Sequence, residues 1–326
     1  MGLLRRRSAS PQMPATPSIG FTFRPTPDAT DRLVSLGATV YVAAQAKVLY
    51  VQVFKAACSS MLWAMSQMVG MDPADHGLST QLHVNRALTI HDTSLHPVPT
   101  IDQVSDELRH EALTSSEWMR VAVVRDPYGR FYSGWESRKL LLHHGPWDGY
   151  PQPPLSFVDG LLDVGASFRD FARAAHEHRG IWQGDFHFAQ QVHVMALDEI
   201  DFTDIVATTD LPSLFQRLSE RSRRRIDPGR HNEGLGISAD DVYDAATAAI
   251  CEDLFAEDFS RLGFAHRPFT APRPTVLDAQ ASAALAMIDE RNKRIEDLVA
   301  AIGRVEEGEE LCWPQIGSSR WPRPST

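Results

Sequence analysis

The feature that most constrains the fold of this chain is a strand–turn–helix pattern that occurs twice. Residues 48–54 form a nearly continuous apolar run that stops at Lys55, and small residues then lead into apolar positions at helical spacing. Residues 119–124 form a second such run, which ends at Arg125 and is followed by helical periodicity over residues 128–142. Continuous apolar runs are typical of strands buried on both faces, and strands that alternate with helices indicate a parallel sheet. The pattern therefore predicts an α/β fold.

Weaker patterns extend this prediction along the chain. A β-rich run also precedes the polar residues 45–47, and a short strand is predicted at residues 204–208. Further helices are predicted at residues 101–117, 167–178, 211–222 and 238–264. We expect a P-loop-like fold of three layers, in which a central parallel sheet is flanked by helices and a C-terminal helical extension follows.

The chain has 326 residues, which suits one large domain with appendages. Residues 1–18 combine arginines, serines and prolines without an apolar pattern, so we expect a disordered tail there. We expect one folded domain over residues 19–265, a proline-rich linker over residues 266–275, a long helix over residues 276–303 and a second disordered tail over residues 304–326.

One side of the predicted helix 276–303 is apolar. Mixed charges lie opposite a stripe that is formed by Leu285, Ile288, Ile295, Leu298 and Ile302. A stripe of this kind is typical of a short coiled coil, although the heptads are few. The helix is therefore a candidate for a homodimer contact.

Composition excludes several classes of function. The formal net charge is -10 and the pI about 5.7, so we expect no nucleic-acid partner, because an acidic protein binds phosphate backbones poorly. Cys58, Cys251 and Cys312 lie too far apart for a disulfide framework or a paired-cysteine metal site. No apolar run approaches the roughly 20 residues of a membrane helix, and no apolar segment follows the N-terminal arginines. We therefore expect a cytoplasmic protein without a transmembrane segment.

The loop that follows residue 54 has the properties of a phosphate-binding loop. Its small residues let the backbone pass close to a ligand, a helix start supplies amide groups and the positive end of a dipole, and Lys55 adds a charge. We assign to this anion site Lys55, Ala56, Ala57, Cys58, Ser59 and Ser60. The loop is not a Walker A loop, because it lacks the GxxxxGK[ST] pattern.

The second strand ends at the same edge of the predicted sheet and delivers Arg125 there. The planar guanidinium of an arginine offers paired donors to a phosphate. Asp126 and Pro127 are typical of the cap and first position of a helix. Ser133 reaches the same anion only if the intervening loop folds over it. We assign Arg125 and Ser133 to the anion site.

Together, VFKAACSS and VVRDPYGRFYSGW resemble the two co-substrate motifs of the sulfotransferase superfamily. They are most similar to its carbohydrate branch, family 2, and to the bacterial members of that branch. The likeness covers roughly residues 40–265 and includes HFAQQ at 187–191, Asn232 and the closing segment 253–264. The resemblance implies that the co-substrate is 3′-phosphoadenosine-5′-phosphosulfate (PAPS), and that the protein is a bacterial cytoplasmic enzyme.

The resemblance also implies roles for the residues of the two loops. Lys55 would contact the leaving-group oxygen, and Ser59 and Ser60 would hold the 5′-phosphate. Arg125 and Ser133 would hold the 3′-phosphate. The acceptor would be a hydroxyl group of a carbohydrate or a glycolipid.

Sulfuryl transfer is an in-line displacement with a loose transition state, so catalysis depends on positioning and on stabilising charge. A general base must take the proton of the acceptor hydroxyl. His91, which lies between the two motifs, is our first candidate for this base, and His187 is the second candidate. The reaction needs no metal to neutralise a polyphosphate, so we expect no metal ion.

Two other functions remain as alternatives. A P-loop-like kinase or nucleotide hydrolase would need a Lys-Ser/Thr pair after a glycine turn and an acidic Mg²⁺ ligand, and the sequence displays neither. A non-catalytic scaffold would associate through the helix at 276–303.

Several residues also have an ordinary structural interpretation. We interpret Cys58 as a small buried residue and not as a nucleophile. Three of the seven tryptophans, Trp63, Trp118 and Trp135, fall at apolar positions and are expected in the core. The arginines of residues 217–230 form either a solvated face or a contact to the 3′-phosphate or to an anionic acceptor.

Overall fold

The computed structural model describes residues 39–71, 86–93, 95–141, 151, 153–231, 234–269, 272 and 275–306. The predicted tail at 1–18, the beginning of the predicted domain at 19–38 and the part of the second predicted tail beyond Glu306 lie outside the described residues.

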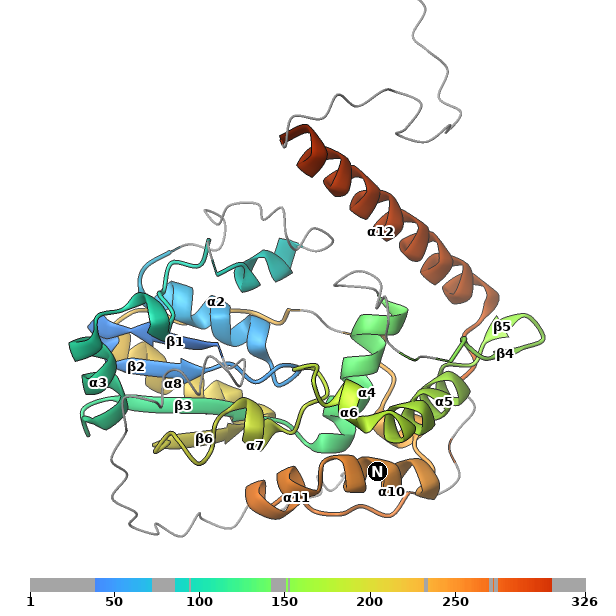
Figure 1. Cartoon of the computed structure of the whole chain (residues 1–326), viewed down its shortest axis with the longest axis horizontal. Coiled ribbons are helices and arrows are strands. Elements are labelled where there is room, and N and C mark those ends of the chain that lie inside the picture. The colour runs from blue at the N-terminus through green and yellow to red at the C-terminus, as the bar shows by residue number, and fades with distance from the viewer. Residues whose placement is uncertain are drawn as a thin grey trace, which may run out of the picture.

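A sheet of four strands forms the centre of the fold (Figure 1). Its strands stand in the order β1 (Val40–Ala43), β2 (Val48–Val51), β3 (Met119–Val124) and β6 (Asp204–Ala207). β2 pairs with β3 in parallel, and β3 pairs with β6 in parallel. Every residue of β1, β2 and β3 is buried, as the continuous apolar runs predict. The predicted α/β fold with a mainly parallel sheet is confirmed.

β1 departs from the parallel arrangement. It runs antiparallel to β2, with Val40 opposite Val51. The two strands are joined by the short helix η1 (Ala44–Ala46) and by Lys47, whose φ of 50° is left-handed. So short a connection can only reverse the chain, because a parallel crossover needs a dozen or more residues.

The remaining elements follow the expected order along the chain. They are α2 (Cys58–Met68), η3 (Arg86–His91), η4 (Ile101–Gln103), α3 (Asp106–Thr114), α4 (Pro127–Trp135), the π-helix η5 (Glu136–Leu140), β4 (Phe157–Val158), β5 (Leu161–Leu162), α5 (Val164–Glu177), α6 (Arg179–Trp182), α7 (Gln191–Val194), η6 (Thr208–Asp210), α8 (Leu211–Ser222), α9 (Ala239–Val242), α10 (Ala245–Leu254), α11 (Ala256–Leu262) and α12 (Ala279–Glu306).

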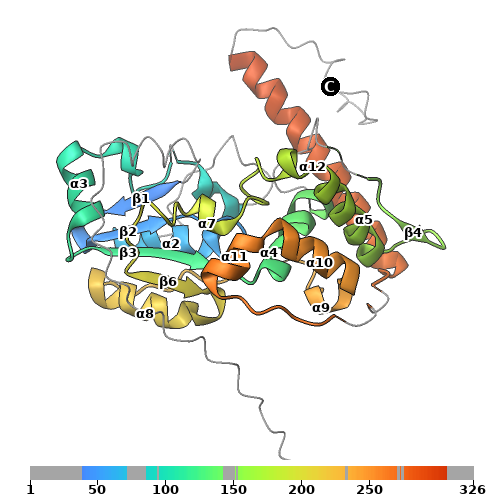
Figure 2. The ribbon, with the colours of Figure 1, turned by 60° about the horizontal axis from the view of Figure 1, so that its bottom comes forward.

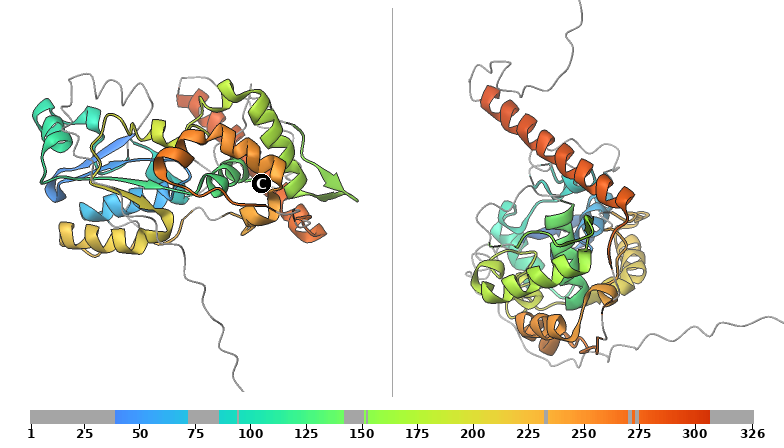
Figure 3. Two further views of the ribbon diagram at one scale, coloured as in Figure 1. Left: turned by 90° about the horizontal axis from the view of Figure 1, so that it is seen from below. Right: turned by 90° about the vertical axis from the view of Figure 1, so that its right-hand side faces the viewer.

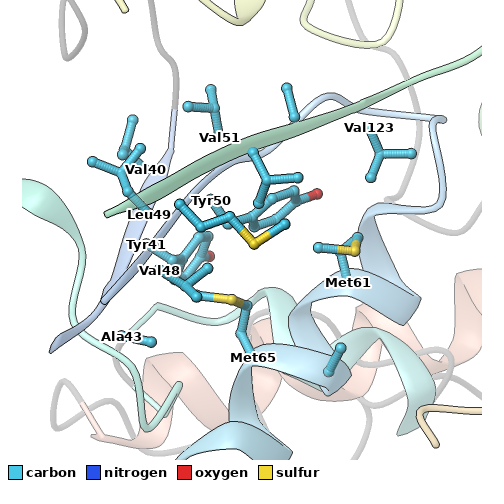
Figure 4. Close-up of a cluster of buried hydrophobic side chains, with 14 of the residues drawn as sticks. Val40, Tyr41, Ala43, Val48, Leu49, Tyr50, Val51, Met61, Met65 and Val123 are labelled. Atoms are coloured by element: carbon cyan, nitrogen blue, oxygen red, sulfur yellow. The ribbon is translucent and has the colours of Figure 1, made fainter. Parts of the chain in front are cut away.

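Helices cover the sheet and share one apolar core with it. α2 and α8 lie together on one face, which the view from below shows (Figure 3), and α3 and α7 contribute to the same core. Figure 4 shows Met61 and Met65 of α2 among side chains of the strands, such as Tyr41 and Tyr50. Full burial of one such side chain stabilises the fold by roughly 1.5–3 kcal/mol, so this interface fixes α2 against the sheet.

A second core, rich in aromatic side chains, joins α4 to α5, α10 and α11 (Figure 2). Phe131 of α4 lies at its centre. Its ring centroid is between 5.4 and 6.0 Å from the rings of Phe168, Phe171, Phe188 and Phe255. Most of these ring pairs are edge-to-face or tilted, the arrangements that aromatic quadrupoles favour. The second core therefore holds α4 firmly beside the sheet.

Arg130 ties the two cores together. Its side chain is buried and donates hydrogen bonds to the carbonyl oxygens of Phe54, Phe186 and Ala189 at 2.9, 2.9 and 2.7 Å. Burial lowers the pKa of Arg130 to about 10, with Asp258 opposing that shift. The loop after β2 is thus fixed to α4 by the same side chain that fixes residues 186–189.

The predicted helix boundaries are correct in outline. The helix predicted at 101–117 is η4 followed by α3, and the region 238–264 holds three short helices. The helix predicted at 276–303 is α12, which continues to Glu306. Within the predicted linker, the guanidinium of Arg267 and the ring of Phe269 pack against Tyr128. Trp63, Trp118 and Trp135 are buried, which confirms their place in the core.

None of the helices that the structure describes combines the length and the apolar character that crossing a membrane requires.

Candidate functional site

A cavity of about 810 Å³ opens where β2 and β3 end. Its walls come from the loop after β2, the start of α2, α4 with η5, the start of α8, and residues 229–231 and 234–237. Ligands of parallel α/β sheets bind at the carboxyl ends of the strands, so the cavity lies where the fold predicts a site.

The loop after β2 turns sharply before α2 begins. Lys55 and Ala57 have positive φ values of 64° and 59°, a left-handed conformation that non-glycine residues seldom adopt. Ala57 caps α2 without a side-chain hydrogen bond. The backbone N–H groups of the first turn, at Cys58, Ser59 and Ser60, therefore have no helical acceptor, and the helix dipole is positive at this end. Such a turn is suited to an anion.

The side chain of Lys55 is the strongest sign that the cavity takes an anion. Lys55 lines the cavity and is 9% exposed. Its ammonium has no hydrogen-bond or ion-pair partner anywhere in the described part of the chain. Burial lowers the pKa of Lys55 to about 8, Cys58 opposes this shift, and the Arg125 guanidinium adds to it. A bound anion would supply the missing counter-charge.

Arg125 lies at the end of β3 and lines the same cavity. Its guanidinium donates to the carbonyl oxygen of Lys55 at 3.3 Å, so the two loops are in direct contact. Its backbone is clamped by Gln191, whose amide accepts from the N–H of Arg125 at 2.9 Å and donates to its carbonyl at 2.8 Å. A methyl group at Gly129 would lie 3.3 Å from Nε of Arg125, so the glycine gives the guanidinium room.

Ser133 lies on α4 and also lines the cavity. The helix begins as predicted, because Asp126 accepts a hydrogen bond from the N–H of Gly129 at 2.9 Å and Pro127 occupies the first turn. Ser133, Lys55 and Arg125 thus line the same cavity. Of the residues that the sequence assigns to the anion site, Ala57, Cys58, Ser59 and Ser60 line the cavity as well, whereas Ala56 is fully buried beside it.

The two histidines occupy different surroundings. His91, at the end of η3, bonds with both of its ring nitrogens to protein groups. The Gln52 amide donates to Nδ1 at 3.0 Å, and Nε2 lies 2.9 Å from Oγ of Ser59. With Nδ1 accepting, the proton is on Nε2 and is donated to Ser59. His91 therefore holds the first turn of α2 in place.

His187 is buried and forms a dyad with a carboxylate. Its Nδ1 lies 2.6 Å from Oδ1 of Asp185, and Arg138 pairs with the other oxygen of Asp185 at 3.6 Å. A carboxylate at Nδ1 places the proton there and leaves Nε2 as the basic nitrogen. Burial lowers the pKa of His187 to about 4, although Asp185 opposes the shift, so the ring is neutral near pH 7.

Sequence reasoning missed Glu136 and Asp185. Glu136 lines the cavity, and its carboxylate accepts from the N–H of Leu235 at 2.9 Å and from the hydroxyl of Tyr132 at 3.2 Å. Burial raises the pKa of Glu136. Glu136 stands three residues beyond Ser133, but no motif marks it. Asp185 lies two residues before His187, the first residue of the HFAQQ segment. This closeness in sequence was the one sign that the carboxylate could contact the histidine.

The arginine-rich segment does not act as one patch. Arg217 pairs with Asp204, Arg221 donates to backbone carbonyls that include that of Ala46, and Arg225 pairs with Asp227. Among the described arginines of this segment, Arg230 lines the cavity. The interpretation as a solvated or structural face thus applies to most of the segment, and one member faces the candidate site.

The described residues contain no group of three or more His, Cys, Asp or Glu side chains that could hold a metal ion.

Fold and site define an α/β protein in which a helix start and two basic strand ends, at Lys55 and Arg125, share one cavity. The sequence profile of the sulfotransferase family matches residues 38–226, which is more than half of the chain. This chain belongs to the sulfotransferase family. Neither the curated proteins nor the solved structures contain a match to it.

Proposed function

We propose that this sulfotransferase uses PAPS as its donor and transfers the sulfuryl group to a hydroxyl group of a carbohydrate or a glycolipid. The observation that carries the proposal is that two basic strand ends share one cavity. Lys55 and Arg125 are 70 residues apart in the sequence and both line it. A nucleotide with phosphates at both ends of its ribose requires two separate cationic contacts, and the cavity provides them.

The donor would lie with its 5′-phosphosulfate against the first turn of α2 and with its 3′-phosphate against Arg125 and Ser133. The unpaired, buried ammonium of Lys55 supports the first contact, because a buried charge is strongly disfavoured until it is paired. Arg230 offers a further cation on the wall lined by residues 229–231 and 234–237.

In the transfer step, the oxygen that links phosphate and sulfate gains negative charge as the sulfur–oxygen bond breaks. Lys55 would stabilise this charge, and a positioned charge in a site sheltered from water is effective in that role. The acceptor oxygen attacks the sulfur from the opposite side, and its proton must pass to a base.

We propose His187 as that base because the Asp185 carboxylate sets its tautomer, and neither histidine is among the described residues that line the cavity. Both ring nitrogens of His91 are engaged by Gln52 and Ser59, so its role would be to position the donor loop. In His187 the Asp185 carboxylate engages Nδ1 and sets the tautomer in which Nε2 accepts a proton. The acceptor class itself rests on the resemblance of the two motifs to the carbohydrate branch.

Calorimetry with adenosine 3′,5′-bisphosphate tests the donor assignment. We expect micromolar binding to the wild-type protein and at least tenfold weaker binding to Lys55→Ala and to Arg125→Ala, since a charge-assisted hydrogen bond contributes about 1.5–3 kcal/mol. Arg225→Ala is the matched control, because Arg225 is exposed and pairs with Asp227. Absence of binding to the wild type at tens of micromolar would overturn the proposal.

A transfer assay separates the candidate functions. We expect radiolabelled sulfate to pass from PAPS to a member of a panel of sugars and glycolipids. Turnover of ATP that depends on Mg²⁺, with no sulfate transfer, would instead favour a kinase or nucleotide hydrolase. If neither reaction occurs and Lys55→Ala changes no property of the protein, the scaffold hypothesis gains support.

A further inference from the structure

The segment that follows α11 returns to the beginning of α4. Arg267, which belongs to this segment and to neither co-substrate motif, donates from Nη2 to Oδ2 of Asp126 at 3.3 Å. Asp126 caps α4 and directly follows Arg125 in the sequence. The two members of this ion pair are 141 residues apart, so a distant part of the chain contacts the loop that carries Arg125.

Several contacts besides this ion pair hold Arg267 in place. Its guanidinium carbon lies 5.0 Å from the centre of the Tyr128 ring and 5.0 Å from that of the Phe269 ring, and the faces of aromatic rings attract cations. Its Nη1 donates to Asp240 of α9 at 3.0 Å, and its backbone N–H donates to the hydroxyl of Tyr128 at 3.3 Å. The position of this positive charge is therefore fixed by the fold and not by Asp126 alone.

The Asp126 carboxylate also lies close to Arg125. A methyl group at Gly129 would lie 3.3 Å from Nε of Arg125 and 3.3 Å from Oδ2 of Asp126, so the two charged groups flank this glycine. Burial lowers the pKa of Arg125, and the charge of Asp126 opposes that shift. Arg125 nevertheless forms no ion pair within the described part of the chain, because Asp126 pairs with Arg267 instead.

This arrangement bears on any phosphate that binds at Arg125. An uncompensated carboxylate beside Arg125 would attract the guanidinium and repel the phosphate. The ion pair with Arg267 offsets the charge of Asp126 and holds Oδ2 at a second cation. Neither Asp126 nor Arg267 is among the described residues that line the cavity, so Arg267 acts on a ligand through Asp126 and not by direct contact.

We propose that Arg267 is a positioning residue of the donor site, and that its ion pair with Asp126 leaves the guanidinium of Arg125 free to bind the 3′-phosphate of the nucleotide. The proposal rests on the proposed function, in which Arg125 holds that phosphate. It gives the segment around Arg267 a role in donor binding.

A purely structural role of Arg267, as a tie between this segment and α4, predicts different results. The side chains of Arg267 and Asp126 are 39% and 40% exposed, and exposed ion pairs contribute little to stability. A structural tie is lost when either partner is replaced. The proposed electrostatic effect arises only when Asp126 keeps its charge and Arg267 has lost its own.

Calorimetry with two nucleotides isolates the contribution of the 3′-phosphate. We expect Arg267→Met to weaken binding of adenosine 3′,5′-bisphosphate about three- to tenfold at low ionic strength, the effect of one uncompensated charge near a phosphate dianion in a largely aqueous setting. Binding of adenosine 5′-monophosphate, which lacks the 3′-phosphate, should change less than about twofold by the same reasoning. Arg261→Met is the matched control, because Arg261 is a surface arginine that pairs with Asp198.

Asp126→Asn provides the rescue that separates the two roles, because an asparagine also caps a helix but carries no charge. We expect Asp126→Asn alone to bind the bisphosphate at least as tightly as the wild type does. The double variant Asp126→Asn with Arg267→Met should regain the affinity that Arg267→Met loses. A double variant as weak as Arg267→Met, or an Arg267→Met protein that binds like the wild type, would overturn the proposal. Should Arg267→Met fail to fold, Arg267→Gln, which keeps hydrogen-bond donors without the charge, takes its place.

Modification of Arg125 by phenylglyoxal, read by peptide mass spectrometry, requires no nucleotide. The reagent attacks the neutral guanidine, so an uncompensated carboxylate nearby slows the reaction by raising the pKa of Arg125. We expect Arg267→Met to slow this modification severalfold and the double variant with Asp126→Asn to restore it. If the wild type binds no bisphosphate, the proposed function fails, while these rates still decide whether Arg267 frees Arg125. Equal rates in the wild type and in Arg267→Met would show that it does not.

Discussion

At the scale of the residue, the buried charge of Lys55 destabilises the folded protein when no anion is bound. Its pKa in the folded protein is about 8, below the ordinary value of 10.5, because the ammonium is buried. The unfolded chain therefore binds the proton more tightly, and the lysine destabilises the folded state fully below pH 8. The penalty disappears as the pH rises to 10.5, where both states are neutral.

Lys55→Met should thus make the nucleotide-free protein more stable and inactive. We expect the free energy of unfolding at pH 7 to rise by about 1–3 kcal/mol and the gain to vanish above pH 10.5, as measured by urea denaturation. Sulfate transfer should fall by about 10²–10³-fold, the effect of removing one transition-state donor. Lys47→Met is the control, since Lys47 is exposed and pairs with Glu111 and Glu117. A destabilised Lys55→Met protein would contradict this account.

The dyad of His187 and Asp185 leads to a pH prediction. The pKa of His187 is lowered to about 4 by burial, so the base is neutral through the neutral range. We expect kcat/KM for the wild type to stay level from pH 7 to pH 5 and to fall below that, as the ring takes a proton. Between pH 6.5 and pH 4 the unfolded chain binds that proton more readily, so stability also decreases as the pH falls.

Asp185→Asn removes the charge that sets the tautomer and should lower kcat about 10²-fold with little change in KM for the donor. Asp198→Asn is the matched control, because Asp198 is an exposed partner of Arg261. If the Asp185→Asn variant keeps full activity and the wild-type pH profile, His187 is not the general base, and His91 becomes the first candidate for it.

Several site residues could be found from the sequence and others could not, for a physical reason. Lys55 and Arg125 follow from strand patterns, because the carboxyl ends of parallel strands meet at one edge. The contact of His91 with Ser59 depends on how residues far apart in the chain pack, so no local pattern reveals it.

At the scale of the element, residues 229–231 and 234–237 line one wall of the cavity and are attached to two neighbouring elements. Ser60 of α2 donates to the carbonyl of Gly229 at 3.2 Å, and Glu136 accepts from the N–H of Leu235 at 2.9 Å. The wall is therefore positioned by two elements that border the site, α2 and η5.

Gly234→Ala tests this attachment. A methyl group at residue 234 would come within 1.7 Å of the Glu136 carboxylate, so the segment must shift away from η5. We expect the affinity for adenosine 3′,5′-bisphosphate to fall about tenfold, since one or two contacts of the wall are lost. Gly180→Ala is the control, because nothing lies within 4 Å of a methyl group there. Equal affinities for the two variants would show that the wall does not contribute to binding.

Most elements were predictable, but the break in the helix after β3 was not. The periodicity of residues 128–142 predicts one helix, whereas α4 gives way to the π-helix η5 at Glu136. A π-helical turn arises where packing demands an extra residue, and such turns are frequent at functional sites. Here η5 carries Glu136 to the cavity and Arg138 to Asp185.

At the scale of the whole molecule, two cores meet at the site. The sheet core holds α2 and the strand ends, the aromatic core holds α4, and Arg130 bonds to backbone on both sides of their boundary. The loop after β2 rests on the sheet core and the loop after β3 leads into the aromatic core. The distance between the two loops is therefore kept only while both cores are intact. The site is therefore a property of the complete domain and not of either strand–loop–helix unit alone.

α12 has several exposed apolar side chains among its described residues. It starts beside β5 and then projects away from the body (Figure 1), with Leu285 buried against the aromatic core. Beyond that point Met287, Ile288 and Leu298 are 63%, 40% and 40% exposed. Exposed apolar side chains on a projecting helix with a near-heptad stripe are typical of a coiled-coil partner surface, and a second copy supplies the identical stripe.

We therefore expect a homodimer that forms through α12. Sedimentation of the full chain should show a mass twice the monomer value of 36.3 kDa at tens of micromolar and dissociation on dilution, since a seam of so few heptads is weak. Ile288→Lys places a charge in the stripe and should give the monomer, whereas Ala286→Lys, on the opposite side of the helix, should still dimerise. Because α12 projects away from the body, the monomeric variant should keep the wild-type affinity for adenosine 3′,5′-bisphosphate. A wild-type protein that stays monomeric at these concentrations would contradict the expected homodimer.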